Sequence, residues 1–280
     1  MKVGLSLAGG GIRGIAHAGI IKALEENNIE IEVIGGTSSG SLVAALYAMG
    51  FNGEEILALF KQYNEKIVGI SAIPIISNFD NMFKNDFNIS GIKEGEAIEI
   101  LYNEIAKSKG LNLMSDLKIP IAVPATNFID SKEYVFSSLK PKNPQYNYIT
   151  DITIGTAVRA SSSFSGVFKP CLYKDKIFLD GGILDNVPVK AVKELGASKV
   201  IAVNFNSDAV DEKSSIMDII MKTLDIMGNK ISEENLQQAD LIITVPTDGT
   251  GLLDVQKIDY CYNSGYQKGL EYIEKIKELF

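Results

Sequence analysis

The chain has 280 residues, of which 46% are hydrophobic and 22% are charged, a composition typical of a globular protein with a large core. Lysine and arginine number 27 against 35 aspartates and glutamates, so the formal net charge is −8. This acidic balance argues against nucleic-acid partners, which need a basic surface, and against simple electrostatic attraction to anionic membranes.

The sequence also bears on the compartment. No apolar run is long enough to span a bilayer. The apolar stretch at the N-terminus is too short, and too interrupted by glycine, for a secretory signal. Cys171 and Cys261 lie far apart in the sequence, in no metal-binding or redox spacing, which is typical of reduced intracellular thiols. We therefore expect a cytoplasmic protein.

The first motif is a glycine loop. Residues 2–8 are predicted to form a buried strand, followed by the loop and a helix; the loop comprises Gly9, Gly10, Gly11, Ile12, Arg13 and Gly14. Its G-x-G-x-x-G spacing fits a dinucleotide site, with Glu30 or Glu32 on the ribose. The alternative is an oxyanion hole, in which successive N–H groups at a helix start bind a negative oxygen while Arg13 holds the loop.

A serine motif follows the next predicted strand, residues 31–34. The run Gly36-Thr37-Ser38-Ser39-Gly40 leads into a predicted helix over residues 41–49, and strand, G-x-S-x-G turn and helix together form the context of a nucleophile elbow. In such a turn Ser38 adopts a strained backbone conformation, while Gly36 and Gly40 allow strand and helix to pass closely. A nucleophile beside the glycine loop favours the oxyanion hole over the dinucleotide site.

His17 is the only histidine in the chain, so a Ser-His-Asp triad would have to use it. It precedes the serine, whereas a triad of the α/β-hydrolase type runs serine, acid, histidine. We expect His17 to support the glycine loop. A carboxylate must then accept the serine proton directly.

That carboxylate is predicted at the end of another strand. Residues 176–180 form a short apolar run that ends in Asp180, followed by Gly181 and Gly182, which would allow close approach of backbone or substrate. Asp185 is nearby, but it suits the following turn better. A Ser38–Asp180 pair would supply the base that the lone histidine does not.

An apolar segment, residues 67–79, has two interpretations. It is interrupted by Pro74 and too short to span a bilayer, so it is either a buried irregular segment or a flap that admits an acyl chain or touches a lipid surface. The second interpretation would make the protein peripheral at the inner face of the membrane. The sequence does not decide between them.

The remaining pattern alternates helices and strands without a repeat or a linker, which favours one α/β domain over residues 1–280. Residues 140–148 and the serine cluster 161–165 are predicted to be loops. The other predicted helices are 53–66, 94–108, 151–160, 187–195, one ending at Met227 whose apolar side we expect in the core, and one at the C-terminus; the other strands are 119–128, 133–137, 199–205 and 240–246.

The three motifs, in this order, resemble the patatin-like phospholipases, and more particularly the bacterial branch related to the catalytic domain of neuropathy target esterase. The resemblance covers about residues 3–205 and includes Arg159-Ala160-Ser161 and Gly166 to Pro170. It implies a three-layer α/β/α sandwich with a mostly parallel sheet and no metal or other cofactor. It also implies a Ser38–Asp180 dyad that hydrolyses lipid esters through an acyl-enzyme, and an oxyanion loop over residues 9–14.

Three alternatives remain at the level of sequence. The same acyl-enzyme would serve an acyltransferase or thioesterase, a nucleotide-dependent enzyme would use the glycine loop differently, and a catalytically idle protein could bind lipid on this fold. Neither the lipid headgroup nor the oligomeric state follows from the sequence.

Overall fold

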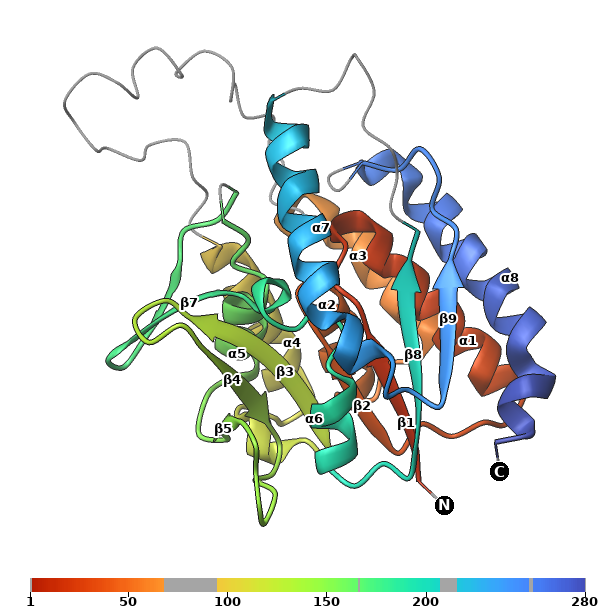
Figure 1. Ribbon diagram of the computed structural model, residues 1–280, viewed down its shortest axis with the longest axis horizontal. Coiled ribbons are helices and arrows are strands. Elements are labelled where there is room, and N and C mark those ends of the chain that lie inside the picture. Colours follow the sequence, from red (N-terminus) through yellow and green to blue (C-terminus); the bar gives the residue numbers. More distant parts are fainter. Residues whose placement is uncertain (1, 68–94, 166, 207–215, 252–253, 280) are drawn as a thin grey trace.

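A mixed, mostly parallel sheet forms the centre of the computed structural model, which describes residues 2–67, 95–165, 167–206, 216–251 and 254–279 (Figure 1). Within these residues the strand order is β5-β4-β3-β2-β1-β8-β9, with β7 paired to β3 and β6 paired to β7. The strands are β1 (Val3–Leu7), β2 (Val33–Gly36), β3 (Ile121–Asn127), β4 (Lys132–Ser137), β5 (Asn147–Ile149), β6 (Cys171–Tyr173), β7 (Lys176–Asp180), β8 (Lys199–Phe205) and β9 (Leu241–Val245).

Strands β3, β2, β1, β8 and β9 run parallel, whereas β4 and β7 are antiparallel to β3. Helices link most of the strands. They are α1 (Ala16–Glu26), α2 (Ser39–Ala48), α3 (Gly53–Ile67), α4 (Glu96–Ser108), α5 (Ile154–Ser161), α6 (Val189–Glu194), α7 (Ile216–Leu236) and α8 (Ile258–Lys277), with short 3-10 turns at Gly11–Ile15, Met114–Asp116, Gly181–Ile183 and Val255–Lys257.

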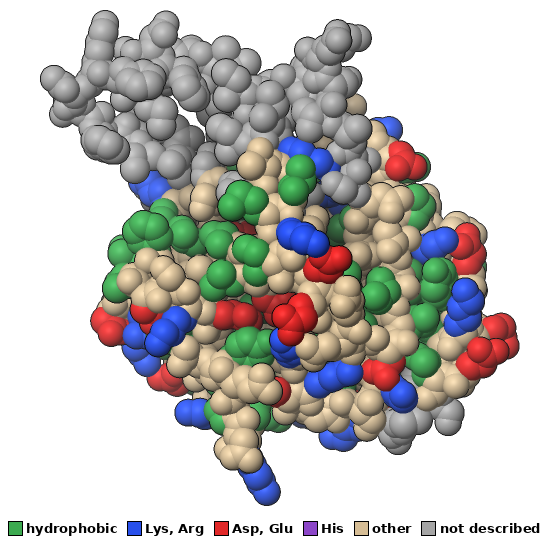
Figure 2. Space-filling model, viewed as in Figure 1, with side chains coloured by type: hydrophobic (Ala, Val, Ile, Leu, Met, Phe, Trp, Pro, Cys, Tyr) green, Lys and Arg blue, Asp and Glu red, His purple; other side chains and the backbone are tan. Residues whose placement is uncertain are grey.

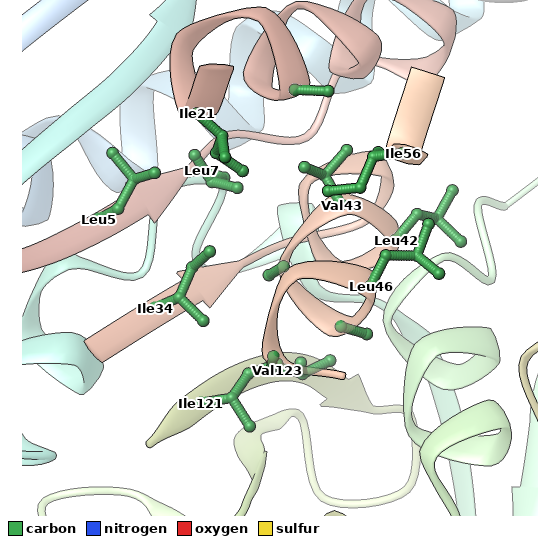
Figure 3. Close-up of a cluster of buried hydrophobic side chains, with 14 of the residues drawn as sticks. Leu5, Leu7, Ile21, Ile34, Leu42, Val43, Leu46, Ile56, Ile121 and Val123 are labelled. Carbon is green, nitrogen blue, oxygen red and sulfur yellow. The ribbon is translucent and has the colours of Figure 1, made fainter. Parts of the chain in front are cut away.

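The sheet is covered on both faces, which gives the three-layer sandwich predicted from the resemblance. Helices α6 and α7 lie on one face, and α1, α2, α3 and α8 lie behind it (Figure 1). The larger core joins α1, α2 and α3 to side chains such as Leu7, Ile34 and Val123 of the central strands (Figure 3). The opposite pleats, including Val33 and Val200, pack with α6. Strands buried on both faces are continuously apolar, as the sequence showed.

Two short strands were not predicted. Strand β5 pairs with β4 over Asn147–Ile149, so the prediction of a loop over residues 140–148 is wrong at its end. Strand β6 forms a hairpin with β7. Each has three residues, too few to show an alternating pattern, and each forms because a longer neighbour offers unpaired backbone groups.

Helix α7 differs from its prediction. It continues past Met227 to Leu236, and Met227, which was expected on the core side, is exposed. The helix lies across the face of the sheet that carries α6, where acidic and basic side chains are interspersed (Figures 1 and 2).

The apolar segment 67–79 lies, from residue 68 onward, outside the described residues. Helix α3 reaches Ile67 and α4 begins at Glu96. None of the helices in the described part of the chain combines the length and the apolar character that a membrane span requires.

Helix α8 packs against α1 through glycines. A Cβ atom at Gly265 would overlap the carbonyl oxygen of Ala16, and a Cβ at Gly19 would overlap that of Tyr262. The two helices therefore approach to backbone contact. This seam attaches the C-terminal helix to the helix that follows the glycine loop.

We expect Gly265→Ala to lower the free energy of unfolding by about 1–3 kcal/mol, because the added methyl group must push the helices apart. Alanine would otherwise stabilise a helix by about 1 kcal/mol, so a net loss identifies the overlap. Urea unfolding of the variant and of Gly251→Ala, where the nearest atom is 4.0 Å from the new Cβ, gives the comparison. Unchanged or increased stability of Gly265→Ala would contradict this packing.

Candidate active site

Ser38 lies on a strained turn between β2 and α2. Its φ and ψ are 52° and −122°, in a region that non-glycine residues avoid, as predicted. A Cβ at Gly36 would overlap the carbonyl oxygen of Gly40, and a Cβ at Gly40 would overlap that of Leu7. These two glycines therefore let strand and helix pass closely enough to form the turn.

Asp180 ends β7 and meets Ser38 from the neighbouring part of the sheet. The Ser38 hydroxyl donates to Asp180 Oδ2 at 2.6 Å, and the Gly182 N–H donates to Oδ1 at 2.8 Å. The meeting follows from topology, because β7 pairs with β3, opposing Asp180 to Ala125, and β3 pairs with β2. The structure thus brings together two residues that are far apart in the sequence.

Burial sets the acidity of this carboxyl group. Asp180 is almost fully buried, and loss of solvation raises its pKa to about 6, while the hydrogen bonds from Ser38 and Gly182 act in the opposite direction. The group is therefore ionised at neutral pH yet basic enough to receive a proton, which is the property required of a general base.

The glycine loop lies directly beside the serine. A Cβ at Gly9 would be 3.1 Å from Ser38 Cβ, and a Cβ at Gly14 would be 2.5 Å from Ser39 Oγ. The Gly9 N–H donates to Asn186. Gly10 and Gly11, with φ of +60° at Gly11, begin a 3-10 turn, and a helical start leaves its first N–H groups without intrahelical acceptors.

Arg13 turns back onto this loop. Its Nε donates to the Gly10 carbonyl at 3.1 Å and Nη1 donates to the Asn206 carbonyl at 3.4 Å, while the guanidinium lies 5.7 Å from the centre of the Phe205 ring. The side chain is buried. Arg13 therefore ties the loop to the end of β8.

His17 is buried beneath the same loop. Its Nε2 is 2.8 Å from the carbonyl oxygen of Ala8, its ring packs on Phe205 at 4.8 Å, and burial lowers its pKa to about 4 despite the opposing bond to Ala8. The ring is therefore neutral at pH 7, and its Nε2 carries the proton that Ala8 accepts. His17 thus contacts Ala8 and Phe205 beside the loop, whereas the Ser38 hydroxyl bonds to Asp180.

The serine cluster, predicted to be a plain loop, contributes to the site. Helix α5 ends at Ser161, whose Oγ accepts the backbone N–H of Ser38 at 3.1 Å, and the Ser163 carbonyl accepts the N–H of Asp180 at 3.1 Å. Both serines are buried. Neighbouring serines that point into the core are recognisable only once the fold is known.

Gly181 and Gly182, which follow Asp180, are closely surrounded by other atoms. A Cβ at Gly181 would overlap the Pro124 carbonyl oxygen, and one at Gly182 would lie 3.1 Å from Asp180 Oδ1. These contacts explain why the turn after β7 needs residues without side chains.

The dinucleotide interpretation of the glycine loop loses Glu32, one of its two candidate acidic residues. The Glu32 carboxylate accepts the N–H of Val3 at the beginning of β1, whereas the glycine loop follows the end of that strand. Glu32 therefore lies at the opposite edge of the sheet from the position that a ribose would occupy.

Comparison with known families identifies the family of this chain. The family model described as patatin-like phospholipase matches residues 5–193, a range that includes the glycine loop, Ser38 and Asp180. The chain belongs to the patatin-like phospholipase family. The patatin-like match ends within α6, so α7 and α8 lie beyond it.

Curated relatives are similar to almost the whole chain, beyond the range of the family match. The chain is 28% identical, over 98% of its length, to lysophospholipase NTE1 of Scheffersomyces stipitis, and 30% identical, over 99%, to lysophospholipase nte1 of Aspergillus niger. It spans only 18% of the length of each relative. The crystal structure of VipD from Legionella pneumophila matches with a TM-score of 0.50 and 16% identity, covering 98% of this chain and 66% of that one, a likeness of fold alone.

Proposed function

We propose that this protein hydrolyses carboxylic esters of lipids through an acyl-enzyme on Ser38, with Asp180 as the base. The observation that carries the proposal is the 2.6 Å hydrogen bond from the Ser38 hydroxyl to the buried Asp180 carboxylate. The strained turn and the adjoining glycine loop support it. Phospholipase is the description of the family, and both curated relatives are lysophospholipases, which favours a phospholipid or lysophospholipid as substrate.

The reaction begins when Asp180 accepts the Ser38 proton as Oγ attacks the ester carbonyl carbon. The carbonyl oxygen becomes an oxyanion, and the N–H groups of Gly10 and Gly11 are the donors that we assign to it, because the N–H of Gly9 is already bonded to Asn186. The tetrahedral intermediate collapses, Asp180 returns the proton to the departing alcohol, and the acyl group remains on Ser38. Water, deprotonated by Asp180, then releases the fatty acid.

The experiment that tests this proposal measures fatty-acid release from lysophosphatidylcholine, with and without an added alcohol acceptor. Release of free fatty acid that the acceptor does not suppress supports hydrolysis. Transfer to the acceptor at the expense of free acid would make the protein an acyltransferase on the same site, and binding of the lipid without any turnover would leave a lipid-binding role. Acyl-thioester turnover in preference to the oxygen ester would indicate a thioesterase.

The raised pKa of Asp180 predicts the pH dependence. Below about pH 6 the carboxyl group is protonated and cannot accept the serine proton, so kcat/KM should fall about tenfold for each unit of pH below that value. His17 does not produce this limb, because its pKa lies near 4. Initial rates between pH 4.5 and 8.5 on a short-chain nitrophenyl ester provide the profile. Full activity retained at pH 5 would contradict the role of Asp180.

A further inference from the structure

The turn that follows Asp180 is bonded to two other parts of the site. Its Asp185 carbonyl accepts the Thr37 hydroxyl at 2.8 Å, next to the nucleophile. Its Asn186 accepts the Gly9 N–H of the glycine loop, both at the backbone carbonyl and at the side-chain Oδ1, each at 3.2 Å. The same turn is therefore bonded to the nucleophile elbow and to the glycine loop.

Asn186 carries the largest share of these contacts. It is 8% exposed, and its side-chain Nδ2 donates to Asn229 Oδ1 at 2.8 Å while its backbone N–H donates to Ser232 Oγ at 2.7 Å. Both partners belong to α7. The amide of Asn186 thus connects the peptide just before Gly10 to a helix that lies beyond the patatin-like match.

Helix α7 contacts this turn through one small and polar stripe. A Cβ at Gly228 would overlap the carbonyl oxygen of Gly182, and Asn235 donates to Asp185 Oδ2 at 2.6 Å. With Asn229 and Ser232, these residues follow helical spacing on a single face, and the helix crosses the sheet face beside the strand ends (Figure 1). The contacts of α7 with this turn are three hydrogen bonds and one close glycine approach, which point to a positioning role.

We propose that Asn186 is a positioning residue for the oxyanion loop, and that Asn229 and Ser232 of α7 hold it in place. The proposal rests on the hydrolase function proposed above. Glycine-rich backbone has more conformational freedom than any other, so its N–H groups point at a developing oxyanion only if neighbouring atoms fix them. The bond of Gly9 to the Asn186 side chain fixes the peptide that precedes the donors.

The first test replaces the side chain alone. In Asn186→Ala the backbone carbonyl can still accept the Gly9 N–H, so we expect the fold to be retained while one of the two bonds to the loop is lost. We expect kcat on a nitrophenyl butyrate ester to fall by about 10- to 100-fold, less than the 10²–10³ typical of losing an oxyanion donor itself. KM should change by less than about threefold, since ground-state binding is not altered.

A second pair of variants tests the contribution of α7. Asn229 is exposed, and its side-chain oxygen accepts the hydrogen bond from Asn186 Nδ2. Asn229→Leu removes this acceptor, whereas Asn229→Asp keeps an oxygen at that position. We expect Asn229→Leu to lower kcat by about 3- to 10-fold and Asn229→Asp to restore most of it. Glu234→Ala, on the exposed side of the same helix, is the matched control.

A third measurement does not depend on catalysis. Amide hydrogen exchange of the peptide covering residues 8–14 should be faster in Asn186→Ala and Asn229→Leu than in Asn229→Asp and Glu234→Ala. Unchanged exchange together with unchanged kcat, or an effect on KM alone, would overturn the positioning role. If the wild-type protein hydrolyses no ester, the proposed function fails, but the exchange measurement still decides the position of the loop. If Asn186→Ala does not fold, the Asn229 pair decides it.

Discussion

Replacing Ser38 with alanine should abolish ester hydrolysis. The oxygen that forms the acyl-enzyme is then missing, and water would have to attack the substrate without covalent catalysis. The expected loss in kcat is about 10⁶-fold, the size found when the nucleophile of a serine hydrolase is removed. Rates of fatty-acid release and of nitrophenyl ester hydrolysis, with melting temperatures measured alongside, provide the comparison.

Covalent labelling makes this result specific to one residue. A fluorophosphonate should modify the wild-type protein at Ser38, as identified by peptide mass, and should not modify Ser38→Ala. Ser108→Ala is the matched control, because Ser108 is an exposed serine at the end of α4, where its hydroxyl bonds to the Ile105 carbonyl. Labelling at another serine, or residual turnover near the wild-type rate, would remove Ser38 from the mechanism.

Replacing Asp180 with asparagine should lower kcat by about 10⁴-fold, comparable to the loss when the aspartate of a serine-protease triad is made an amide. An asparagine oxygen can still accept the Gly182 N–H, so the turn is preserved. It cannot accept a proton at neutral pH. The hydroxyl of Ser38 would then have no base, and fluorophosphonate labelling should slow in parallel.

The same variant should not lose stability. The pKa of Asp180 is about 6 in the folded protein against 3.8 for the free side chain, so the carboxyl group holds its proton more tightly when folded. Its contribution to stability is therefore full below the free pKa, declines between about pH 4 and 6, and stays at its minimum above that range. At pH 8 we expect Asp180→Asn to melt no lower than the wild type.

Asp175→Asn serves as the control for the Asp180 substitution, since Asp175 is a highly exposed aspartate in the turn before β7. It should leave both the rate and the melting temperature unchanged. A near-normal rate in Asp180→Asn would contradict the dyad, and a large fall in its melting temperature at pH 8 would contradict the assigned pKa.

Most elements could be predicted because their patterns are local. The buried strands β1 and β8 are continuous apolar runs, and helices such as α4 show helical spacing of apolar residues. Strands β5 and β6 have no such pattern, since their pairing partners lie elsewhere in the chain. Helix α7 differs from its prediction for a related reason: its Gly228, Ser232 and Asn235 contact the turn after Asp180, a segment that is distant in the sequence.

The sequence by itself determined which residues could carry the chemistry and how each is presented. The sharp turn at Ser38 needs glycines two residues to either side, and an aspartate followed by two glycines is typical of a strand end. Both patterns can be read from the sequence because they depend on residues close together in the chain. The sequence also contains a single histidine, placed before the serine, which favoured a carboxylate as the base. The proposed roles of Ser38 and Asp180 remain predictions that the variants above test.

Only the tertiary structure decided which of these residues meet. The bond between Ser38 and Asp180 exists because β7 pairs with β3, a choice made by backbone hydrogen bonds between distant segments. The pKa of Asp180 depends on burial, which is a property of the packed molecule. The connection from Asn186 to α7 likewise has no local signature, since a single asparagine in a sequence does not indicate which residues its side chain will contact. Its role comes from the groups that the fold places around it.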